Sequence, residues 1–158
     1  MDVDNYIERT RLASGDRTFV NLNNGRIDGY EVVYRHALEQ QQFQIAYTSY
    51  KGKADNGDYL ADIPSDEVSI NYGFGIDNWY FGLDWQYRLD KDETGSGELP
   101  NNSYDVLDMS FEYQLNQLWS LSINLDNVLD ELYVPSNDDL DTFATGRMLG
   151  VSLHWRGG

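Results

Sequence analysis

The chain has 158 residues, which suggests one domain, and a formal net charge of −16, which argues against nucleic acid as a partner. It contains no cysteine, so disulfides, thiolate metal sites and thiol catalysis are excluded. No apolar run approaches the length of a transmembrane helix. A mean hydropathy of −0.59 does not exclude strands that cross a membrane, because half of each such strand is polar.

Apolar and polar residues alternate through most of the chain, with the period of two that is typical of strands. The second expected strand is long, and we expect it to bend or bulge around Asn23-Asn24-Gly25, a turn-prone triplet. In chain order, the pattern predicts strands near 3–12, 18–36, 41–52, 67–75, 79–90, 104–115, 118–128 and 147–156.

The clearest strand is the segment 79–89, WYFGLDWQYRL, in which large apolar residues occupy every second position. Successive side chains of a strand point to opposite faces, so one face is strongly apolar and the other is largely polar. Trp79 and Tyr87 lie near the two ends of the apolar face. This placement suits a strand that crosses a bilayer, because Trp and Tyr prefer the two interfaces.

The connections between the expected strands alternate in length. Those at 38–40, 76–78 and 116–117 are short, whereas those at 53–66, 91–103 and 129–146 are long and polar. Outer-membrane barrels have short periplasmic turns and long extracellular loops. The sequence therefore predicts an all-β, antiparallel, up-and-down transmembrane β-barrel of about eight strands, either the last strands of a larger barrel or a barrel closed on itself. An even strand count places both termini on the periplasmic side.

The polar face carries charged residues that we interpret as structural packing rather than as a site. They are Asp84, Arg88, Asp108, Glu112, Asn124, Asp126, His154 and Arg156. His36 and His154 are the only histidines, and both fall near the predicted periplasmic rim. A metal site would need more ligands at closer spacing, and no catalytic motif occurs. The sequence thus predicts no enzyme, no metal site and no cofactor.

Candidate ligand contacts lie in or beside the long loops, where aromatic and acidic residues gather. We expect them at Tyr59, Tyr133, Asp138, Asp139 and Phe143. The acidic loop residues have two interpretations. They are either solvated loops, or sites for divalent cations that bridge the chain to anionic lipopolysaccharide or for calcium bound within the loops.

Several segments resemble the C-terminal part of the barrel of TonB-dependent outer-membrane receptors. NLDNVLDELY resembles the family's penultimate strand and the loop after it, with Asn127, Asp130 and Tyr133 at the characteristic places. GRMLGVSLHW resembles the closing strand and ends on Trp155, although Arg156-Gly157-Gly158 follow. Residues 21–32, NLNNGRIDGYEV, also resemble a strand of the family and include Gly29 and Glu31. Residues 60–70, LADIPSDEVSI, resemble a loop that leads into a strand. Residues 4–8, DNYIE, are similar to a strand entry of the haem and haemoglobin receptor branch.

This resemblance implies the last eight strands of a barrel of about 22 strands. It implies an outer-membrane receptor of a Gram-negative bacterium for an iron–siderophore chelate or haem, in contact with outer-membrane lipid, lipopolysaccharide and the barrel-assembly machinery. The family's plug domain and TonB box precede the barrel, and no signal peptide opens this chain. We therefore expect residues 1–158 to form a single barrel unit, with TonB acting only through a plug outside it.

Two other classes of protein are alternatives. A soluble, lipocalin-like barrel for a small apolar ligand fits the length and the strand number, with the apolar face lining a cavity. Aromatics near strand ends, one-sided long loops and the absence of a Gly-x-Trp signature argue against it. A small outer-membrane enzyme would need an acid, a base or a nucleophile clustered at the outer rim, where no histidine is expected.

Overall fold

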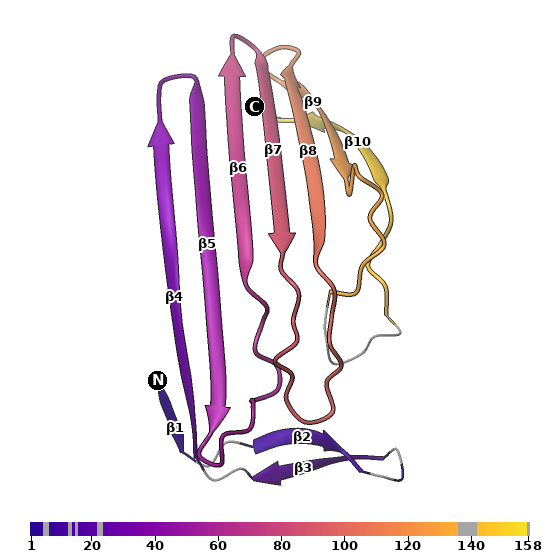
Figure 1. Cartoon of the computed structure of the whole chain (residues 1–158). Helices are drawn as coiled ribbons and strands as arrows, with labels where there is room; N and C mark the ends of the chain where they lie inside the picture. The colour runs from indigo at the N-terminus through magenta and orange to yellow at the C-terminus, as the bar shows by residue number, and fades with distance from the viewer. Residues whose placement is uncertain (5–6, 13, 15, 22–23, 136–141, 158) are drawn as a thin grey trace.

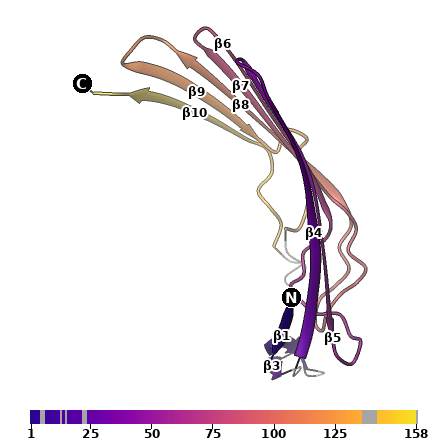
Figure 2. The same ribbon diagram turned by 90° about the vertical axis from the view of Figure 1, so that its left-hand side faces the viewer.

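The computed structural model describes residues 1–4, 7–12, 14, 16–21, 24–135 and 142–157, and its main feature is one curved antiparallel sheet (Figures 1 and 2). The sheet has eight strands in the order β1-β4-β5-β6-β7-β8-β9-β10. A separate hairpin of two strands, β2 with β3, lies across one end of the sheet (Figure 1). The strands are β1 (Asp2–Asp4), β2 (Ile7–Arg11), β3 (Arg17–Asn21), β4 (Asn24–Ala37), β5 (Gln41–Ala54), β6 (Glu67–Ile76), β7 (Trp79–Arg88), β8 (Tyr104–Gln114), β9 (Trp119–Asp126) and β10 (Met148–Trp155).

The six strands from β5 to β10 agree with the sequence-based prediction to within two residues at each end. The first two expected strands are wrong, because the segment 3–12 divides into β1 and β2, and the segment 18–36 divides into β3 and β4. β2 and β3 pair with each other, from Ile7 opposite Asn21 to Arg11 opposite Arg17. Closing so short a loop costs little entropy, so a local hairpin competes well with pairing in the large sheet.

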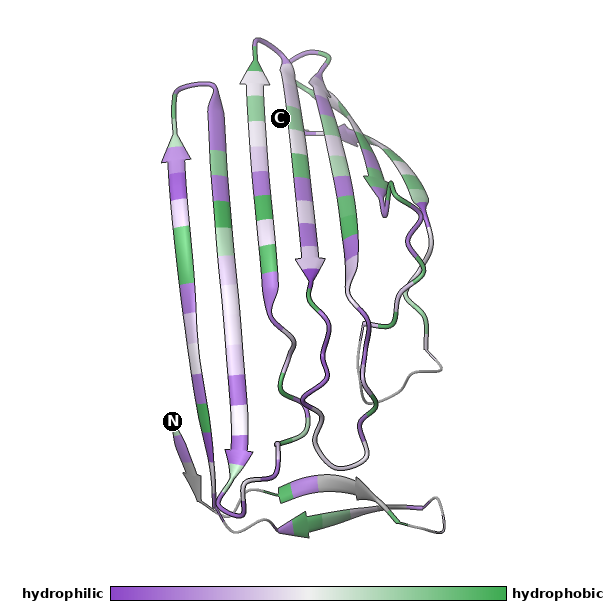
Figure 3. Ribbon diagram, viewed as in Figure 1, coloured by the Kyte–Doolittle hydropathy of each residue, from purple (hydrophilic) through white to green (hydrophobic). Residues whose placement is uncertain are grey.

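The register aligns apolar residues of neighbouring strands in rows on one face of the sheet. Ile45 lies opposite Ile70, which lies opposite Trp85, and Trp85 lies opposite Leu107. The next positions along each strand form polar rows on the other face, and Figure 3 shows this alternation along β6 and β7. No second layer packs on the apolar face of the described residues, and Tyr30, Val32, Tyr34 and Val151 on it are exposed. The predicted alternation is confirmed, and the apolar face is not covered by a second layer among the described residues.

The sheet is open at both edges. Among the described residues, β10 pairs with β9 alone and β1 pairs with β4 alone. The alternative of an eight-stranded barrel closed on itself is therefore wrong for this structure. At one of these edges, β1 has only three residues and forms no full wall strand.

The two chain ends lie at opposite ends of the sheet (Figure 1). The backbone N–H of Ile27 donates to the carbonyl of Met1, 2.9 Å away, at the end of the sheet where the long connections lie. Trp155 lies opposite Trp119, at the end with the short turns. The expectation that both termini lie on one side is wrong, because it counted residues 3–12 as a complete crossing strand. No helix among the described residues has the length and apolar character needed to cross a membrane.

Two aromatic groups bound the apolar face, one at each end of the strands. At the turn end, the rings of Trp79 and Tyr113 are 4.1 Å apart between centroids. At the level of Tyr87, near the loop end of β7, the rings of Tyr30 and Tyr47 in the middle of β4 and β5 are 5.7 Å apart. Along β7, the eight steps from Trp79 to Tyr87 cover about 27 Å. An apolar band of about 25 Å between aromatic girdles is the form of a sheet that spans an outer membrane.

The polar face is held by side-chain hydrogen bonds that cross four strands. Arg35 Nε donates to Gln44 Oε1 at 2.6 Å, and Gln44 Nε2 donates to Asn71 Oδ1 at 3.3 Å. Asn71 Nδ2 in turn donates to Asp84 Oδ1. These partners lie directly opposite each other in the register, so each bond stabilises one strand pair. Asp84 thus has the structural role predicted for it.

Gly29 packs closely against Tyr50 on the polar face, so a larger residue at this position should destabilise the sheet. A Cβ at position 29 would lie 2.7 Å from Tyr50 Cε1 and 2.9 Å from the carbonyl oxygen of Ser49. We expect Gly29→Ala to lower the free energy of unfolding by about 1–3 kcal/mol, because backbone must shift to admit the methyl group. Gly150→Ala is the control, since a Cβ there has Asn124 Cβ as its nearest neighbour at 3.9 Å. Urea unfolding of the folded protein compares the two, and equal midpoints would contradict the prediction.

Candidate functional site

The long connections 55–66, 89–103 and 127–147 gather at one end of the sheet together with the β2–β3 hairpin (Figure 1). We call this the loop end. Contacts between residues distant in sequence hold it together. The geometry of these contacts decides which side chains are free to meet a ligand.

A buried ion pair organises the connection 89–103. Lys91 Nζ lies 2.9 and 3.0 Å from the two carboxylate oxygens of Glu98, and the two side chains are only 6% and 3% exposed. The same carboxylate accepts hydrogen bonds from the backbone N–H of Asp62 at 2.9 Å and of Gly95 at 2.8 Å. Glu98 therefore joins the connection 89–103 to the connection 55–66.

The hairpin is attached to these loops through Glu8 of β2. Glu8 is buried, and its Oε1 accepts a hydrogen bond from the backbone N–H of Ala61 at 2.7 Å. Burial raises the pKa of Glu8, while hydrogen bonds from the backbone of Ala61 and Ser96 act in the opposite direction. Beside Ala61, the buried side chain of Leu60 lies against Gly25. One carboxylate thus fixes the hairpin to the apex of the loop 55–66.

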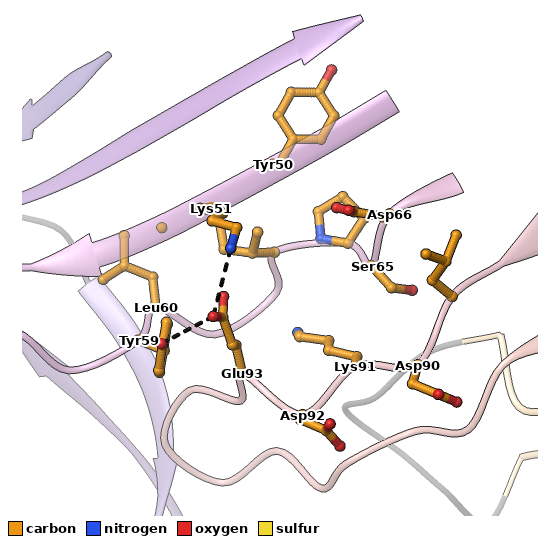
Figure 4. A pocket seen from close by; sticks show the side chains of 14 residues that line it. Tyr50, Lys51, Tyr59, Leu60, Ser65, Asp66, Asp90, Lys91, Asp92 and Glu93 are labelled. Carbon is orange, nitrogen blue, oxygen red and sulfur yellow. Dashed lines mark hydrogen bonds and ion pairs between the residues drawn. The ribbon is translucent and has the colours of Figure 1, made fainter. Parts of the chain in front are cut away.

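A hollow of about 310 Å³ opens between β5 and these two loops (Figure 4). Lys51 Nζ lies 3.6 Å from Glu93 Oε1, and the Tyr59 hydroxyl donates to the same carboxylate at 3.1 Å. In Figure 4, Lys51 points towards Glu93, whereas Tyr50 points away from it. The lining combines aromatic rings with charges of both signs: Tyr50, Lys51, Tyr59, Asp66, Asp90, Lys91, Asp92 and Glu93.

The third long loop is anchored by Asn127, which is buried and adopts a left-handed backbone conformation with φ of 49°. Its Nδ2 donates to the carbonyls of Glu131 at 2.9 Å and Thr145 at 3.3 Å, and its Oδ1 accepts from the N–H of Glu131 at 2.9 Å. Asp130, with φ of 57°, accepts from the N–H of Arg147 at 3.0 Å. Both residues thus tie the two ends of the loop together.

The five loop residues proposed as ligand contacts do not form one cluster. Tyr59 lines the hollow of Figure 4, whereas Tyr133 stacks on Tyr104 with 4.3 Å between ring centroids. Phe143 is 56% exposed and does not line that hollow. Asp138 and Asp139 fall outside the described residues.

The other family-motif residues lie on the wall of the sheet. Gly29 lies beneath the ring of Tyr50, which it faces across the β4–β5 pair. Glu31 is exposed and lies opposite Thr48 on the polar face. Trp155 ends β10 with its ring centroid 6.5 Å from that of Trp119. None of these three residues lines the hollow of Figure 4.

The histidines are separated as expected. His36 lies on β4 opposite Phe43 and His154 on β10 opposite Ser120, so most of the sheet lies between them. In the described part of the chain, no three histidine or carboxylate side chains are placed to hold a metal ion. Sequence reasoning missed Glu8, Lys91 and Glu98. The one available signal was Lys91, the single cation in the acidic segment 90–98.

Three comparisons with known proteins address the family. A model described as "TonB dependent receptor-like, beta-barrel" matches residues 1–128. No curated protein matches the chain. Among solved structures, the copper transporter OprC is similar with a TM-score of 0.84 and 18% identity, over 98% of this chain and 26% of that one.

Two iron receptors are similar in the same way. The ferric-catecholate import receptor Fiu from Escherichia coli K12 gives a TM-score of 0.73 and 20% identity, over 98% of this chain and 24% of that one. The pyoverdine receptor FpvA from Pseudomonas aeruginosa PAO1 gives a TM-score of 0.76 and 17% identity, over 99% of this chain and 26% of that one. At such identities the likeness shows the fold, and the chain spans about a quarter of the length of these structures.

The family model decides between the classes of protein that the sequence left open. It overturns the lipocalin-like alternative, because the matching family is that of TonB-dependent receptor barrels. It also agrees with the prediction that the chain is not an enzyme, because the matching family consists of transporters. The chain therefore belongs to the TonB-dependent receptor family and is a segment of its outer-membrane β-barrel.

Proposed function

We propose that this segment forms part of the wall and of the extracellular ligand-capturing loops of a receptor that imports an iron chelate. The observation that carries the proposal is the family match over residues 1–128, combined with a loop end in which aromatic and charged side chains surround a hollow. Aromatic rings stack on the flat rings of chelators, and cations attract anionic ferric complexes. Tyr59 and Lys51, which both contact Glu93, are the residues we assign to this contact.

The names of the similar structures support a metal complex as the cargo, since they refer to copper, ferric-catecholate and pyoverdine. None of these three names refers to haem, so the haem branch rests on the segment DNYIE alone. We therefore propose a ferric chelate in preference to haem. Energy from TonB would act through a plug domain that is not among these residues. The end of β10, where Trp155 lies opposite Trp119, would be available to the barrel-assembly machinery.

The proposal is tested by uptake in cells that produce the complete receptor with these strands. The probes are iron-55 complexed to a catecholate siderophore, iron-55 pyoverdine, copper ions and haemin. We expect energy-dependent uptake of one ferric chelate and none in cells that lack TonB. Tyr59→Ala should reduce that uptake roughly tenfold, because a stacking contact contributes about 1–1.5 kcal/mol.

Two further variants separate ligand contact from loop folding. Tyr59→Phe keeps the ring and loses only the hydrogen bond to Glu93, so it should retain most of the uptake. Leu132→Ala changes an exposed side chain of another loop and should leave uptake unchanged. Uptake of haemin alone, or uptake that persists without TonB, would contradict the proposed function.

A further inference from the structure

Glu93 is the side chain that joins the two residues assigned to ligand contact. The Lys51 ammonium lies 3.6 Å from Glu93 Oε1, and the Tyr59 hydroxyl donates a hydrogen bond of 3.1 Å to the same oxygen. Figure 4 shows both interactions as dashed lines that meet at the Glu93 carboxylate. The two groups suited to receive an anionic ligand are therefore already held by an anion of the chain itself.

Lys51 and Tyr59 both extend from a fixed backbone. Lys51 lies opposite Asp28 within the β4–β5 pair, and Tyr59 forms an isolated bridge with Lys53 of β5. The Lys53 ammonium also lies 4.7 Å from the centre of the Tyr59 ring, so a cation–π contact holds one face of that ring. The cation and the hydroxyl are thus preorganised, and a ligand that binds to them orders few additional groups.

The backbone beside Glu93 is anchored on both sides, whereas the side chain is not. Before it in the chain, Lys91 and Asn101 exchange backbone hydrogen bonds of 2.8 and 3.1 Å. After it, the N–H of Gly95 donates to the buried carboxylate of Glu98 at 2.8 Å. The Glu93 side chain itself is 46% exposed. It is therefore able to turn into solvent while the connection that carries it keeps its fold.

The contacts of Glu93 are of a kind that an incoming anion replaces at little cost. Its ion pair with Lys51 is long and exposed, so water screens it and the pair contributes little free energy. The Tyr59 hydroxyl would donate equally well to an anionic oxygen of a ligand, so the exchange conserves the hydrogen bond. A carboxylate or catecholate oxygen at the edge of a flat chelating ring matches this place, because it also brings the ring against Tyr59.

We propose that Glu93 determines the specificity of this site by occupying the position of the ligand's anionic group. A ferric chelate that presents a carboxylate or catecholate oxygen displaces Glu93 from Lys51 and Tyr59. A chelate without such an anion leaves the three side chains together and binds weakly. The inference rests on the proposed function, because it concerns the same hollow, and it adds the chemical group that the chelate must present.

The test measures binding to the purified complete receptor in detergent, by quenching of its tryptophan fluorescence. The probes are the polyanionic ferric complex of a tris-catecholate siderophore and the neutral ferric complex of a trihydroxamate siderophore. We expect the wild type to prefer the tris-catecholate complex. Glu93→Gln should bind that complex about fivefold more tightly, because glutamine keeps the size of the side chain and removes the charge that competes for Lys51. The gain with the trihydroxamate complex should be much smaller.

Asp92→Asn is the matched control, because it removes the same charge from the neighbouring residue. Asp92 lines the same hollow, and in Figure 4 its carboxylate points away from Lys51. This variant should gain clearly less affinity for the tris-catecholate complex than Glu93→Gln. Hydrogen exchange at residues 62 and 95 should match the wild type in both variants, because those amides are bound to Glu98.

Equal gains in the two variants would overturn the proposal, since general repulsion by the acidic loop would then explain both. The proposal would also be wrong if Glu93→Gln bound the tris-catecholate complex no better than the wild type, or if the wild type preferred the trihydroxamate complex. These results leave the proposed function intact, because the receptor still binds a ferric chelate. If the wild type bound neither complex nor ferric pyoverdine, the proposed function itself would be contradicted, and this inference with it.

Discussion

Lys91→Met is expected to destabilise the loop end of the sheet by about 3–5 kcal/mol, because it leaves the Glu98 carboxylate buried without its cation. Glu98 is only 3% exposed at its side chain and also binds the N–H groups of Asp62 and Gly95. The hydrogen bonds of those two amides should therefore weaken together. Hydrogen exchange of the folded receptor measures this directly, as faster exchange at residues 62 and 95, while amides within β7 and β8 keep their protection.

A second variant separates the effect of the charge from the effect of lost packing. Glu98→Gln retains an oxygen that accepts hydrogen bonds and removes the negative charge, so in the double variant Lys91→Met/Glu98→Gln no buried charge remains unpaired. We expect the double variant to exchange more slowly at residue 62 than Lys91→Met alone. If the two single changes simply add, the ion pair is not what joins these loops, and the interpretation of Glu98 is wrong.

The strands of the sheet could be predicted from the sequence because apolar and polar residues alternate along each strand, according to the face that each side chain occupies. Between Trp79 and Arg88, membrane-facing and inward-facing residues differ at every step, and the strand ends were found within two residues. Alternation also gave the correct faces, since the pairing of Ile70 with Trp85 follows from parity and turn length. It failed at the hairpin, because alternation does not say which partner a strand chooses.

The contacts of the loop end could not be predicted from the sequence in the same way, because they join residues far apart in the chain. The carboxylate of Glu8 meets the backbone of Ala61, which is 53 residues away, and no local pattern marks such a pair. Glu98 is similar, since its role depends on where the amide of Asp62 lies. The resemblance to a family did identify Asn127 and Asp130. Their geometry then explained why those residue types are suited to positions with positive φ.

Asn127→Ala is expected to lower the free energy of unfolding by about 2–4 kcal/mol, because it leaves three backbone groups of the last loop without their partner. The lost bonds join Asn127 to the N–H and carbonyl of Glu131 and to the carbonyl of Thr145. The change also places alanine at φ of 49°, a conformation that disfavours a Cβ. Urea unfolding of the complete receptor measures the loss.

The contribution of the side chain is separated from that of the backbone by Asn127→Gly, which tolerates the positive φ and still lacks the amide. We expect the free energy of unfolding of Asn127→Gly to exceed that of Asn127→Ala by about 1 kcal/mol and to stay clearly below that of the wild type. Asn124→Ala, on the exposed polar face of β9, is the matched control and should change stability little. If glycine proved as stable as asparagine, backbone conformation alone would explain the residue. The bonds from its amide would then contribute nothing to holding the loop on the barrel wall.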